Sequence, residues 1–530
     1  MRGELICGCA ASLALGACAT PAADPRPNVL FILADDLGYG DLSVYNPQGR
    51  IRTPHLDRLA SEGMRFTDAH SSAAVSTPTR YGLLTGCCPW RGPLKQGVIW
   101  TWADPLLTGE RTLPAMLREA GYATALVGKW HLGIGFATTD GAPVDRAANG
   151  ANVDYTQPLE DGPTHHGFDY YYGDDVPNFP PYAFIENDRF PEIPDRPFEA
   201  GMPGVPGVMA ASWRPERLLT VETEKAVAYI REHRDGPFFL MVSLTAPHTP
   251  IAPTPEFEGR SRAGRYGDFV EEMDHRIGEM LAALRDAGIE ERTIVVFSSD
   301  NGSSFQDGGT AGGERYGGRF GSILDLGHNP SGRFRGMKSD SWEGGHRIPF
   351  LVRWPGVIPA GSVTDALTCD LDLYATLADV AGVTLSEGDA GAPPSRVSPP
   401  QPLAHAAAAG RGARAHVTRR AIRKRDSLLH PRRVETHRRL GVGRLAQPLR
   451  PGRPAARVRH GVGTVAQRAA LQPGVRSRGA LRPGGPSPAA CCADDGGARP
   501  RGAPRRHGGG LAAGCMDLPL RGIICHTLTS

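Results

Sequence analysis

The sequence lacks several features that would assign it to a broad structural class. Beyond a short apolar run near its start, no segment of the 530 residues is apolar over a length that crosses a bilayer, which excludes a multi-pass membrane protein. No internal repeat is evident, which argues against a solenoid. Only three of the ten cysteines lie between residues 20 and 390. Cys87, Cys88 and Cys369 fit neither a disulfide framework nor a cysteine metal site, so we assign them no role.

Residues 391–530 contain no Phe, Tyr, Trp or Asn. They carry 25 Arg and one Lys against five acidic residues, although the formal net charge of the whole chain is only +3. Such a composition buries too little apolar surface to offset chain entropy. We interpret this tail as disordered or frameshifted, since GC-rich DNA read out of frame yields this Arg/Ala/Gly/Pro mixture. Resequencing that shows an intact frame near residue 390 would contradict the frameshift.

Residues 1–19 are typical of a signal peptide. Arg2 precedes an apolar, small-residue run from Leu5 to Ala19 that is too short to span a bilayer. Within it, Leu15-Gly16-Ala17-Cys18 resembles a bacterial lipobox, which implies a lipid anchor at Cys18; cleavage near Ala19 is the alternative. We expect an exported bacterial protein, either periplasmic or an outer-membrane lipoprotein. Charge alone suggests that the basic tail binds nucleic acid, but an exported protein has little use for such an arm, so we expect no nucleic-acid partner.

Between these ends, helix-like segments alternate with strand-like ones. This order predicts an α/β fold with a mostly parallel central sheet between helix layers. Short apolar runs predict strands over residues 28–34, 123–127, 238–244 and 293–297. Amphipathic or capped segments predict helices over residues 53–63, 113–120, 215–233 and 269–287.

Carboxylates follow two of the predicted strands directly. Asp35 and Asp36 end the first, and Asp300 and Asn301 follow the fourth. Three carboxylates and an amide form a hard-oxygen set suited to Ca²⁺ or Mg²⁺. A turn or helix cap also explains an isolated Asp-Asp pair, but the second oxygen-rich strand end argues against that alternative.

Basic groups follow the other two strands. Lys129 and His131 come after the second, and His248 comes after the third. A lone histidine is usually a structural residue, but ligands of open α/β sheets bind at the carboxyl ends of strands. We therefore expect these groups to share one crevice with the carboxylates.

Residues 76–86 combine a hydroxyl side chain and a cationic side chain with residues that favour the start and the end of a helix. Pro78 fits the first turn of a helix and Gly86 suits its end, which places Ser76 at the N-terminus. Unpaired backbone N–H groups bind an anion at a helix N-terminus, and the Arg80 side chain, one turn further along the helix, can reach the same anion. For Ser76 alone, an ordinary capping serine is the alternative.

The whole run, Ser76-x-Pro78-x-Arg80 followed by Leu84-Thr85-Gly86, resembles the signature of the sulfatase family. Lys338 lies in a Gly-x-Lys segment followed by Trp-Glu-Gly-Gly, which is similar to the active-site lysine segment of sulfatases. The resemblance covers about residues 27–385 and implies an alkaline-phosphatase-like fold. Sulfatases normally end in a small sheet-and-helix subdomain, and nothing in residues 391–530 resembles it.

The resemblance also implies a set of site residues. The implied ligands of one Ca²⁺, with Mg²⁺ as the alternative, are Asp35, Asp36, Ser76, Asp300 and Asn301. The implied sulfate-binding and proton-transfer residues are Ser76, Arg80, Lys129, His131, His248 and Lys338. Ser76 would be oxidised to formylglycine (3-oxoalanine) by a maturation enzyme of the serine type.

In the implied mechanism the hydrated aldehyde at position 76 attacks sulfur, with Asp300 accepting its proton. His248, aided by Lys338, protonates the leaving alcohol. A second hydroxyl at position 76, deprotonated with help from His131, then expels sulfate. An unmodified serine would be trapped as a stable sulfate ester, which is why the oxidation matters.

Residues 149–207 are rich in proline, aromatic and acidic residues, which suits loops that bind a sugar or form a structural flap. We expect the chain to be a sulfuric ester hydrolase acting on a sulfated carbohydrate or an aryl sulfate. One alternative is a phosphomonoester, phosphodiester or phosphonate hydrolase that uses Ser76 directly. Another is an inactive remnant that binds glycans.

Overall fold

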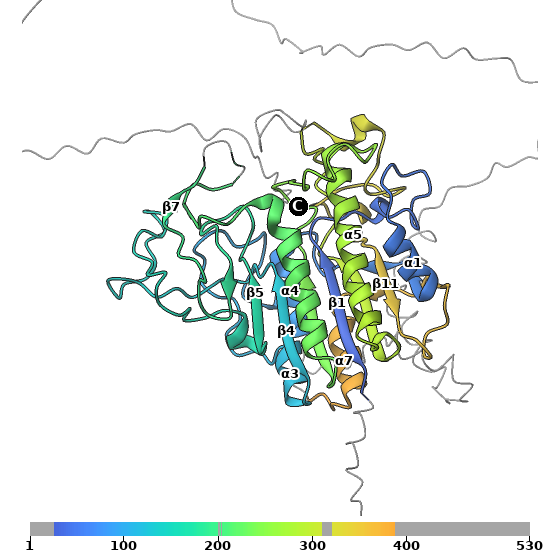
Figure 1. Ribbon diagram of the computed structural model, residues 1–530, viewed down its shortest axis with the longest axis horizontal. Coiled ribbons are helices and arrows are strands. Elements are labelled where there is room, and N and C mark those ends of the chain that lie inside the picture. Colours follow the sequence, from blue (N-terminus) through green and yellow to red (C-terminus); the bar gives the residue numbers. More distant parts are fainter. Residues whose placement is uncertain (1–25, 200–201, 203, 310–320, 387–530) are drawn as a thin grey trace, which may run out of the picture. The chain divides into compact units, whose positions relative to one another are not determined.

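The apolar runs of the sequence form the inner strands of a nine-stranded sheet (Figure 1). The computed structural model describes residues 26–199, 202, 204–309 and 321–386, all within one unit of the chain, Met1–Ser427. Five neighbouring strands run parallel in the order β10, β1, β9, β4 and β5. Their bounds are β1 Asn28–Ala34, β4 Ala123–Gly128, β5 Tyr170–Gly173, β9 Phe238–Ser243 and β10 Thr293–Ser299.

Antiparallel pairs occur only toward the edges of this sheet, where β11 pairs with β10 and β2, and β6 pairs with β5. The outer strands are β2 Met64–Phe66, β6 Ile185–Glu186, β11 Phe350–Arg353 and β12 Ser362–Thr364. Two small two-stranded sheets pair β3 Ala69–His70 with β13 Thr368–Cys369, and β7 Arg196–Pro197 with β8 Val208–Met209.

Helices cover both faces of the central sheet. The first layer holds α1 Pro54–Glu62, α4 Leu218–Glu232 and α5 Gly264–Asp286, and α4 and α5 are drawn in front of β1 and β4 in Figure 1. The second layer holds α2 Ser76–Thr85, α3 Leu113–Glu119 and α7 Asp372–Ala381. The short α6 covers Glu343–His346. Short 3-10 helices lie at Tyr39–Asp41, Pro89–Arg91, Pro163–His166, Pro215–Arg217, Glu290–Arg292 and Ile323–Leu326.

Strand β1 shows why the inner strands are continuously apolar. All seven of its residues are buried, because helices pack on both faces of the sheet. Alternate side chains enter opposite cores: Val29, Phe31 and Leu33 pack with the α2, α3 and α7 side, and Leu30, Ile32 and Ala34 with the α1, α4 and α5 side. The predicted α/β class, with a mostly parallel sheet between helix layers, is confirmed.

Element boundaries differ slightly from the prediction. A separate 3-10 turn occupies Pro215–Arg217, so α4 begins only at Leu218. Helix α5 begins at Gly264, five residues before the predicted start, because no residue in that stretch interrupts the backbone hydrogen bonding. Gly86 ends α2 in the left-handed conformation, with a φ of 65°. A Cβ there would approach the Tyr374 ring to 2.8 Å, so this position requires glycine on two counts.

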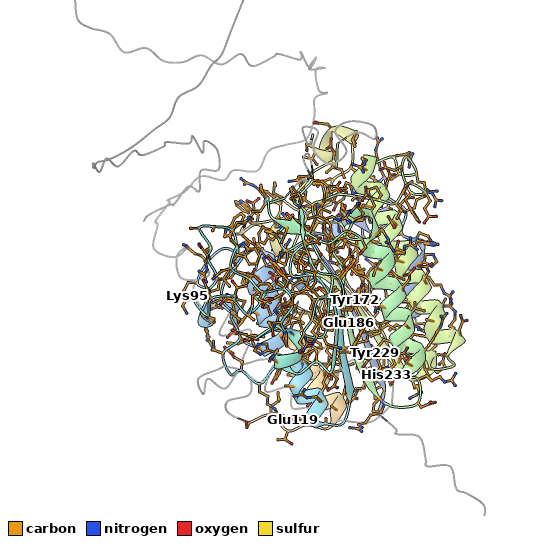
Figure 2. All side chains as sticks on the ribbon, turned by 60° about the vertical axis from the view of Figure 1, so that its left-hand side comes forward. Lys95, Glu119, Tyr172, Glu186, Tyr229 and His233 are labelled. Atoms are coloured by element: carbon orange, nitrogen blue, oxygen red, sulfur yellow. The ribbon has the colours of Figure 1, made fainter. Side chains whose placement is uncertain are left out.

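Aromatic and charged side chains cluster at the β5–β6 edge, some of them labelled in Figure 2. Tyr229 and His233 of the α4 end stack with ring centroids 3.8 Å apart, and Lys225 pairs with Glu186 at 2.7 Å. A cavity of about 390 Å³ lies beside them. None of the predicted site residues lines this cavity.

Three sequence interpretations fall outside the described residues: the signal peptide with its lipobox at Cys18, the basic tail from residue 391, and the missing C-terminal subdomain. Among the described residues, no helix combines the length and the apolar character needed to cross a membrane.

Candidate active site

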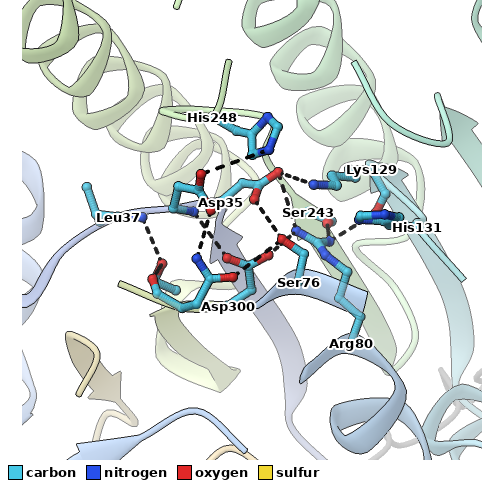
Figure 3. Close-up of polar contacts among 12 residues, drawn as sticks. Asp35, Leu37, Ser76, Arg80, Lys129, His131, Ser243, His248 and Asp300 are labelled. Atoms are coloured by element: carbon cyan, nitrogen blue, oxygen red, sulfur yellow. Dashed lines mark hydrogen bonds and ion pairs between the residues drawn. The ribbon is translucent and has the colours of Figure 1, made fainter. Parts of the chain in front are cut away.

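The carboxyl ends of the inner strands meet at one edge of the sheet. The register aligns Ala34 of β1 with Ser299 of β10, and Gly128 of β4 with Ser243 of β9. The side chains that follow these ends therefore converge, as Figure 3 shows, with the N-terminus of α2 delivering Ser76 among them. The structure brings together all the residues predicted for the site.

Ser76 lies at the centre of this cluster. It is the first residue of α2 and only 1% exposed. Its Oγ is 3.3 Å from Asp35 Oδ1 and 3.4 Å from Asn301 Oδ1. The hydroxyl therefore stands between oxygen groups from two strand ends rather than capping its own helix, which sets aside the capping alternative.

Lys129 neutralises Asp35 in a fully buried pair. Its Nζ donates to Asp35 Oδ2 at 2.6 Å, and neither side chain is exposed. Burial alone raises the pKa of Asp35, but Lys129, His248 and Arg80 outweigh it and lower that pKa to about 2. Asp35 is consequently an anion at any working pH.

Arg80 connects the carboxylates of β1 and β10. One guanidinium nitrogen lies 2.9 Å from Asp300 Oδ2 and 3.7 Å from Asp35 Oδ2, and the other donates to Ser243 Oγ and to the Lys129 carbonyl. Its Nε is buried without a hydrogen-bond partner among the described residues. The Nε–H of Arg80 is therefore an unpaired buried donor. A donor of this kind is available to an acceptor oxygen of a bound ligand.

Asp36 turns back at the end of β1 with a φ of 65°. Its backbone N–H donates to Asp300 Oδ1 at 3.1 Å, and its carboxylate accepts from Asn301 Nδ2 at 2.7 Å. Since the Asn301 amide nitrogen is used in this way, its oxygen faces Ser76. Lys338 Nζ donates to Asp36 at 2.8 Å, and although burial opposes it, this cation lowers the pKa of Asp36.

Close backbone contacts hold the Lys338 loop in place. Lys338 N donates to the Ser303 carbonyl, just beyond β10, and Gly302 N donates to the Gly345 carbonyl, both at 2.9 Å. A Cβ on Gly302 would approach the Gly344 carbonyl oxygen to 1.9 Å. Glycine is therefore needed at Gly302, where two backbones meet beside Asn301. The Gly344-Gly345 pair is needed as well, because a Cβ on either residue would lie 2.1 Å from a backbone carbonyl oxygen.

The contacts of His131 define its tautomer. Its ring Nε2 lies 3.2 Å from the Ile99 carbonyl, which only accepts, so Nε2 carries the proton. Nδ1 is buried and has no partner among the described residues, which leaves its lone pair free to take a proton. The backbone is left-handed, with a φ of 58°, and its N–H donates to Asp175 Oδ1 at 3.0 Å.

His131 is expected to make stability pH-dependent. Burial, then Lys129 and Arg80, lower its pKa well below 6.5, so the unfolded chain binds this proton first as the pH falls. The free energy of unfolding should therefore decrease below about pH 6.5 by up to about 1.4 kcal/mol per pH unit from this group. Urea unfolding from pH 7 to 5 measures the slope, and the His131→Gln variant should show a shallower one. Equal slopes in both proteins would contradict this assignment.

His248 faces the same cluster from the segment after β9. Its Nδ1 donates to the Thr249 carbonyl at 2.6 Å, which directs Nε2 toward Asp36, 3.9 Å from Oδ2. Burial lowers the pKa of His248, and the attraction of Asp35 only partly offsets this effect. The ring is therefore placed to exchange a proton at Nε2.

The arrangement fits a divalent cation. Two oxygens bound to one Ca²⁺ lie at most about 5 Å apart. Ligand atoms of Asp35, Asp36 and His248 lie within 4.8 Å of one another, and Ser76 Oγ reaches both Asp35 and Asn301. The charges also fit, because Arg80, Lys129 and Lys338 balance the three aspartates, and a divalent cation would add the positive charge that an anionic ester requires.

Sequence reasoning missed two residues that shape the site. Ser243, the last residue of β9, binds Arg80, and Ile99, in a loop, orients His131. A serine inside an apolar run of strand type was the only signal for the first. Ile99 acts through its backbone carbonyl, which every residue has, so the sequence could not indicate its role.

The family model described as Sulfatase matches residues 27–383. The chain belongs to the sulfatase family. The resemblance inferred from Ser76, Arg80 and the Lys338 segment is thereby confirmed, and the chain is grouped with sulfuric ester hydrolases.

Several sulfatases resemble this one over the same part of the chain. The N-acetylgalactosamine-6-O-sulfatase of Bacteroides thetaiotaomicron is 35% identical over 382 residues, covering 67% of this chain and 72% of that protein. The arylsulfatase of Hemicentrotus pulcherrimus is 33% identical and covers 68% of this chain and 59% of that protein. The chain thus spans about three fifths to three quarters of these relatives' lengths.

Solved structures agree with the alkaline-phosphatase-like fold implied by the family. A 6S-sulfatase structure from work on glycosaminoglycan metabolism by Bacteroides thetaiotaomicron has a TM-score of 0.59 and 32% identity, covering 69% of this chain and 79% of that one. The structure of Ps i-CgsB with k-i-k-neocarrahexaose has a TM-score of 0.52 and 25% identity, covering 69% and 74%.

Proposed function

We propose that this sulfatase removes sulfate from a sulfated saccharide, with Ser76 converted to formylglycine and Ca²⁺ held by Asp35, Asp36, Asp300 and Asn301. The observation that carries the proposal is the position of Ser76 Oγ, 3.3 Å from Asp35 and 3.4 Å from Asn301 at the start of α2. The conversion removes two hydrogen atoms, that is two protons and two electrons, from the Ser76 side chain, and we assign this oxidation to a separate maturation enzyme of the serine type.

A sugar is proposed as the substrate because one relative, 35% identical to this chain over 382 residues, is named an N-acetylgalactosamine-6-O-sulfatase. The aromatic residues of segment 149–207 suit that substrate class. Export with a lipid anchor at Cys18 would expose the enzyme to extracellular glycans, and it belongs to the same proposal.

Different residues of the chain bind the sulfate group and transfer protons. Arg80, Lys129 and Lys338 bind the sulfuryl oxygens and stabilise the charge that develops on them. His248 donates a proton from Nε2 to the leaving oxygen of the sugar in its imidazolium form, which the charges of Asp35 and Asp36 favour although burial opposes it. His131 takes a proton at Nδ1, the nitrogen that the Ile99 carbonyl leaves free.

Asp300 accepts the proton of the attacking hydroxyl. The hydrogen bond from the Asp36 backbone N–H holds the Asp300 carboxylate in place. A bound divalent cation supplies charge neutralisation and makes an oxygen at position 76 easier to deprotonate. The roles of all these residues belong to the proposal.

The direct test is sulfate release from N-acetylgalactosamine 6-sulfate and 4-nitrophenyl sulfate, with the matching phosphates assayed in parallel. We expect turnover of sulfates and little turnover of phosphates. Faster phosphate release would favour the phosphohydrolase alternative instead. Binding of the sulfated sugar without turnover of either ester would indicate an inactive glycan-binding protein.

Removing the metal should stop the reaction and lower stability. Dialysis against EDTA is expected to abolish sulfate release, and added Ca²⁺ should restore it more effectively than Mg²⁺. At about 100 times its Kd, Ca²⁺ adds about 2.7 kcal/mol to the free energy of unfolding, which a thermal melt detects.

The matched variants for this test are Asp36→Asn and Asp195→Asn. Asp36 belongs to the oxygen cluster, whereas Asp195 is exposed on a loop. The Ca²⁺-dependent rise in melting temperature should disappear in Asp36→Asn and persist in Asp195→Asn. A rise that survives in both would place the ion elsewhere.

A further inference from the structure

An exposed tryptophan stands beside the site on a segment that the site itself holds. Ile99 N donates to Thr77 Oγ1 at 3.3 Å, and the Ile99 carbonyl accepts from His131 Nε2. Two residues later, Thr101 Oγ1 donates to the Pro180 carbonyl at 3.2 Å. Trp100 is therefore anchored on both sides, by the neighbour of Ser76 and by the segment that carries Phe179.

The Trp100 ring has one covered face and one free face. It stacks on Phe179 with centroids 5.4 Å apart and an angle of 29°, yet it remains 66% exposed. Phe179 is buried and meets the His131 ring edge-on, at 6.1 Å and 87°. Two aromatic contacts thus connect the exposed indole to a proposed proton acceptor of the reaction.

Exposed aromatic residues scattered singly on a surface need no explanation. Trp90 is such a case: it is 61% exposed and follows the C-terminus of α2, at the opposite end of the helix from Ser76. Trp100 differs because its ring is stacked, its backbone is held from both sides, and its partner contacts His131.

We propose that the free face of Trp100 is the platform on which the sugar ring of the substrate lies while its sulfate ester reaches Ser76. The C–H face of a sugar ring is apolar and packs well on an indole, whereas its hydroxyls stay at the solvated rim. The centroid distances of 5.4 Å from Trp100 to Phe179 and 6.1 Å from Phe179 to His131 limit how far the indole lies from His131. Trp100 is thus a specificity-determining residue, and the inference rests on the proposed saccharide substrate.

The test is a comparison of Trp100→Ala, Trp100→Phe and Trp90→Ala with the wild type on N-acetylgalactosamine 6-sulfate. Loss of a stacking contact should raise KM about tenfold in Trp100→Ala and leave kcat nearly unchanged, since the platform binds ground state and transition state alike. Trp100→Phe, which keeps an aromatic face, should recover most of the affinity. Trp90→Ala should match the wild type, and thermal melts check that each variant is folded.

The possible results distinguish a failure of the Trp100 platform from a failure of the proposed function. An active wild type whose KM is unchanged in Trp100→Ala would overturn the platform and leave the proposed function standing. A wild type that releases no sulfate from the sugar would overturn the proposed function, and the platform with it. A fall in kcat without a rise in KM would also overturn the platform, because it would show that the indole acts on the reacting groups instead.

Discussion

Replacing Ser76 by alanine should reduce sulfate release by at least about 10⁴-fold, the scale on which enzymes lose activity with their nucleophile. Fold and stability should change little, because the two contacts of its hydroxyl, at 3.3 and 3.4 Å, are long. Initial-rate assays with the sulfated sugar and thermal melts measure both quantities. A Ser76→Ala protein with wild-type activity would remove Ser76 from the reaction.

Thr79→Val provides a matched control for the loss of a hydroxyl from the same helix. Thr79 Oγ1 donates to the Ala73 carbonyl at 3.1 Å and contacts none of the carboxylates. This variant should retain its activity. Comparable inactivation of both variants would indicate damage to α2 rather than loss of a nucleophile.

Mass spectrometry of the peptide containing residue 76 tests the formylglycine itself. Conversion lowers the peptide mass by two hydrogen atoms relative to serine. Unmodified Ser76 in fully active protein would contradict the conversion. A Ser76→Cys variant that is converted only in a host with a cysteine-type maturation enzyme would support the serine-type assignment for the wild type.

Replacing Lys129 by methionine should weaken both the fold and the reaction. The variant leaves Asp35 buried with a weaker partner, Arg80 at 3.7 Å, and such losses cost about 3–5 kcal/mol of the free energy of unfolding. The rate should fall about 10²–10³-fold because one stabilising charge at the sulfuryl group disappears. Urea unfolding and initial rates measure the two effects.

The control for Lys129→Met is Lys225→Met at the β5–β6 edge. The Lys225–Glu186 pair has nearly the same length, 2.7 Å, but its side chains are 32% and 36% exposed. An exposed pair contributes about 0–1 kcal/mol, so this variant should be nearly as stable and active as the wild type. Equal destabilisation by both substitutions would contradict the argument from burial.

A double substitution separates stability from catalysis. Asp35→Asn combined with Lys129→Met removes both charges of the buried pair, so much of the lost stability should return. Activity should not return, since the proposed metal ligand Asp35 and the proposed sulfate-binding cation Lys129 are both absent. Recovery of activity in the double variant would show that the pair is structural only.

Much of the fold was predictable because local patterns and tertiary packing agree. The run 28–34 is apolar at every position, and β1 occupies those same residues with both faces covered. Pro78 and Gly86 delimited α2 correctly to within two residues. The start of α5 was predicted late because Gly264 and its neighbours lack the apolar periodicity on which the prediction relied.

The candidate site was predictable at the level of residue types and less so at the level of contacts. The sequence indicated that Asp35, Asp300 and Ser76 converge, since strand ends and a helix start meet at the carboxyl edge of a parallel sheet. It did not indicate that Arg80 is shared between Asp300 and Ser243, residues 220 and 163 positions away. Such pairings depend on side-chain rotamers and on the lateral order of strands.

By itself, the sequence determined the α/β class, the strand ends that carry carboxylate and amide side chains, and the helix that presents Ser76, because each follows from periodicity, capping and residue chemistry within a short window. Only the tertiary structure decided which cation neutralises which carboxylate, which nitrogen of His131 is free, and where Trp100 stands. These features join segments distant along the chain, and their geometry is set by strand register, burial and the path of loops, none of which is a local property of the sequence.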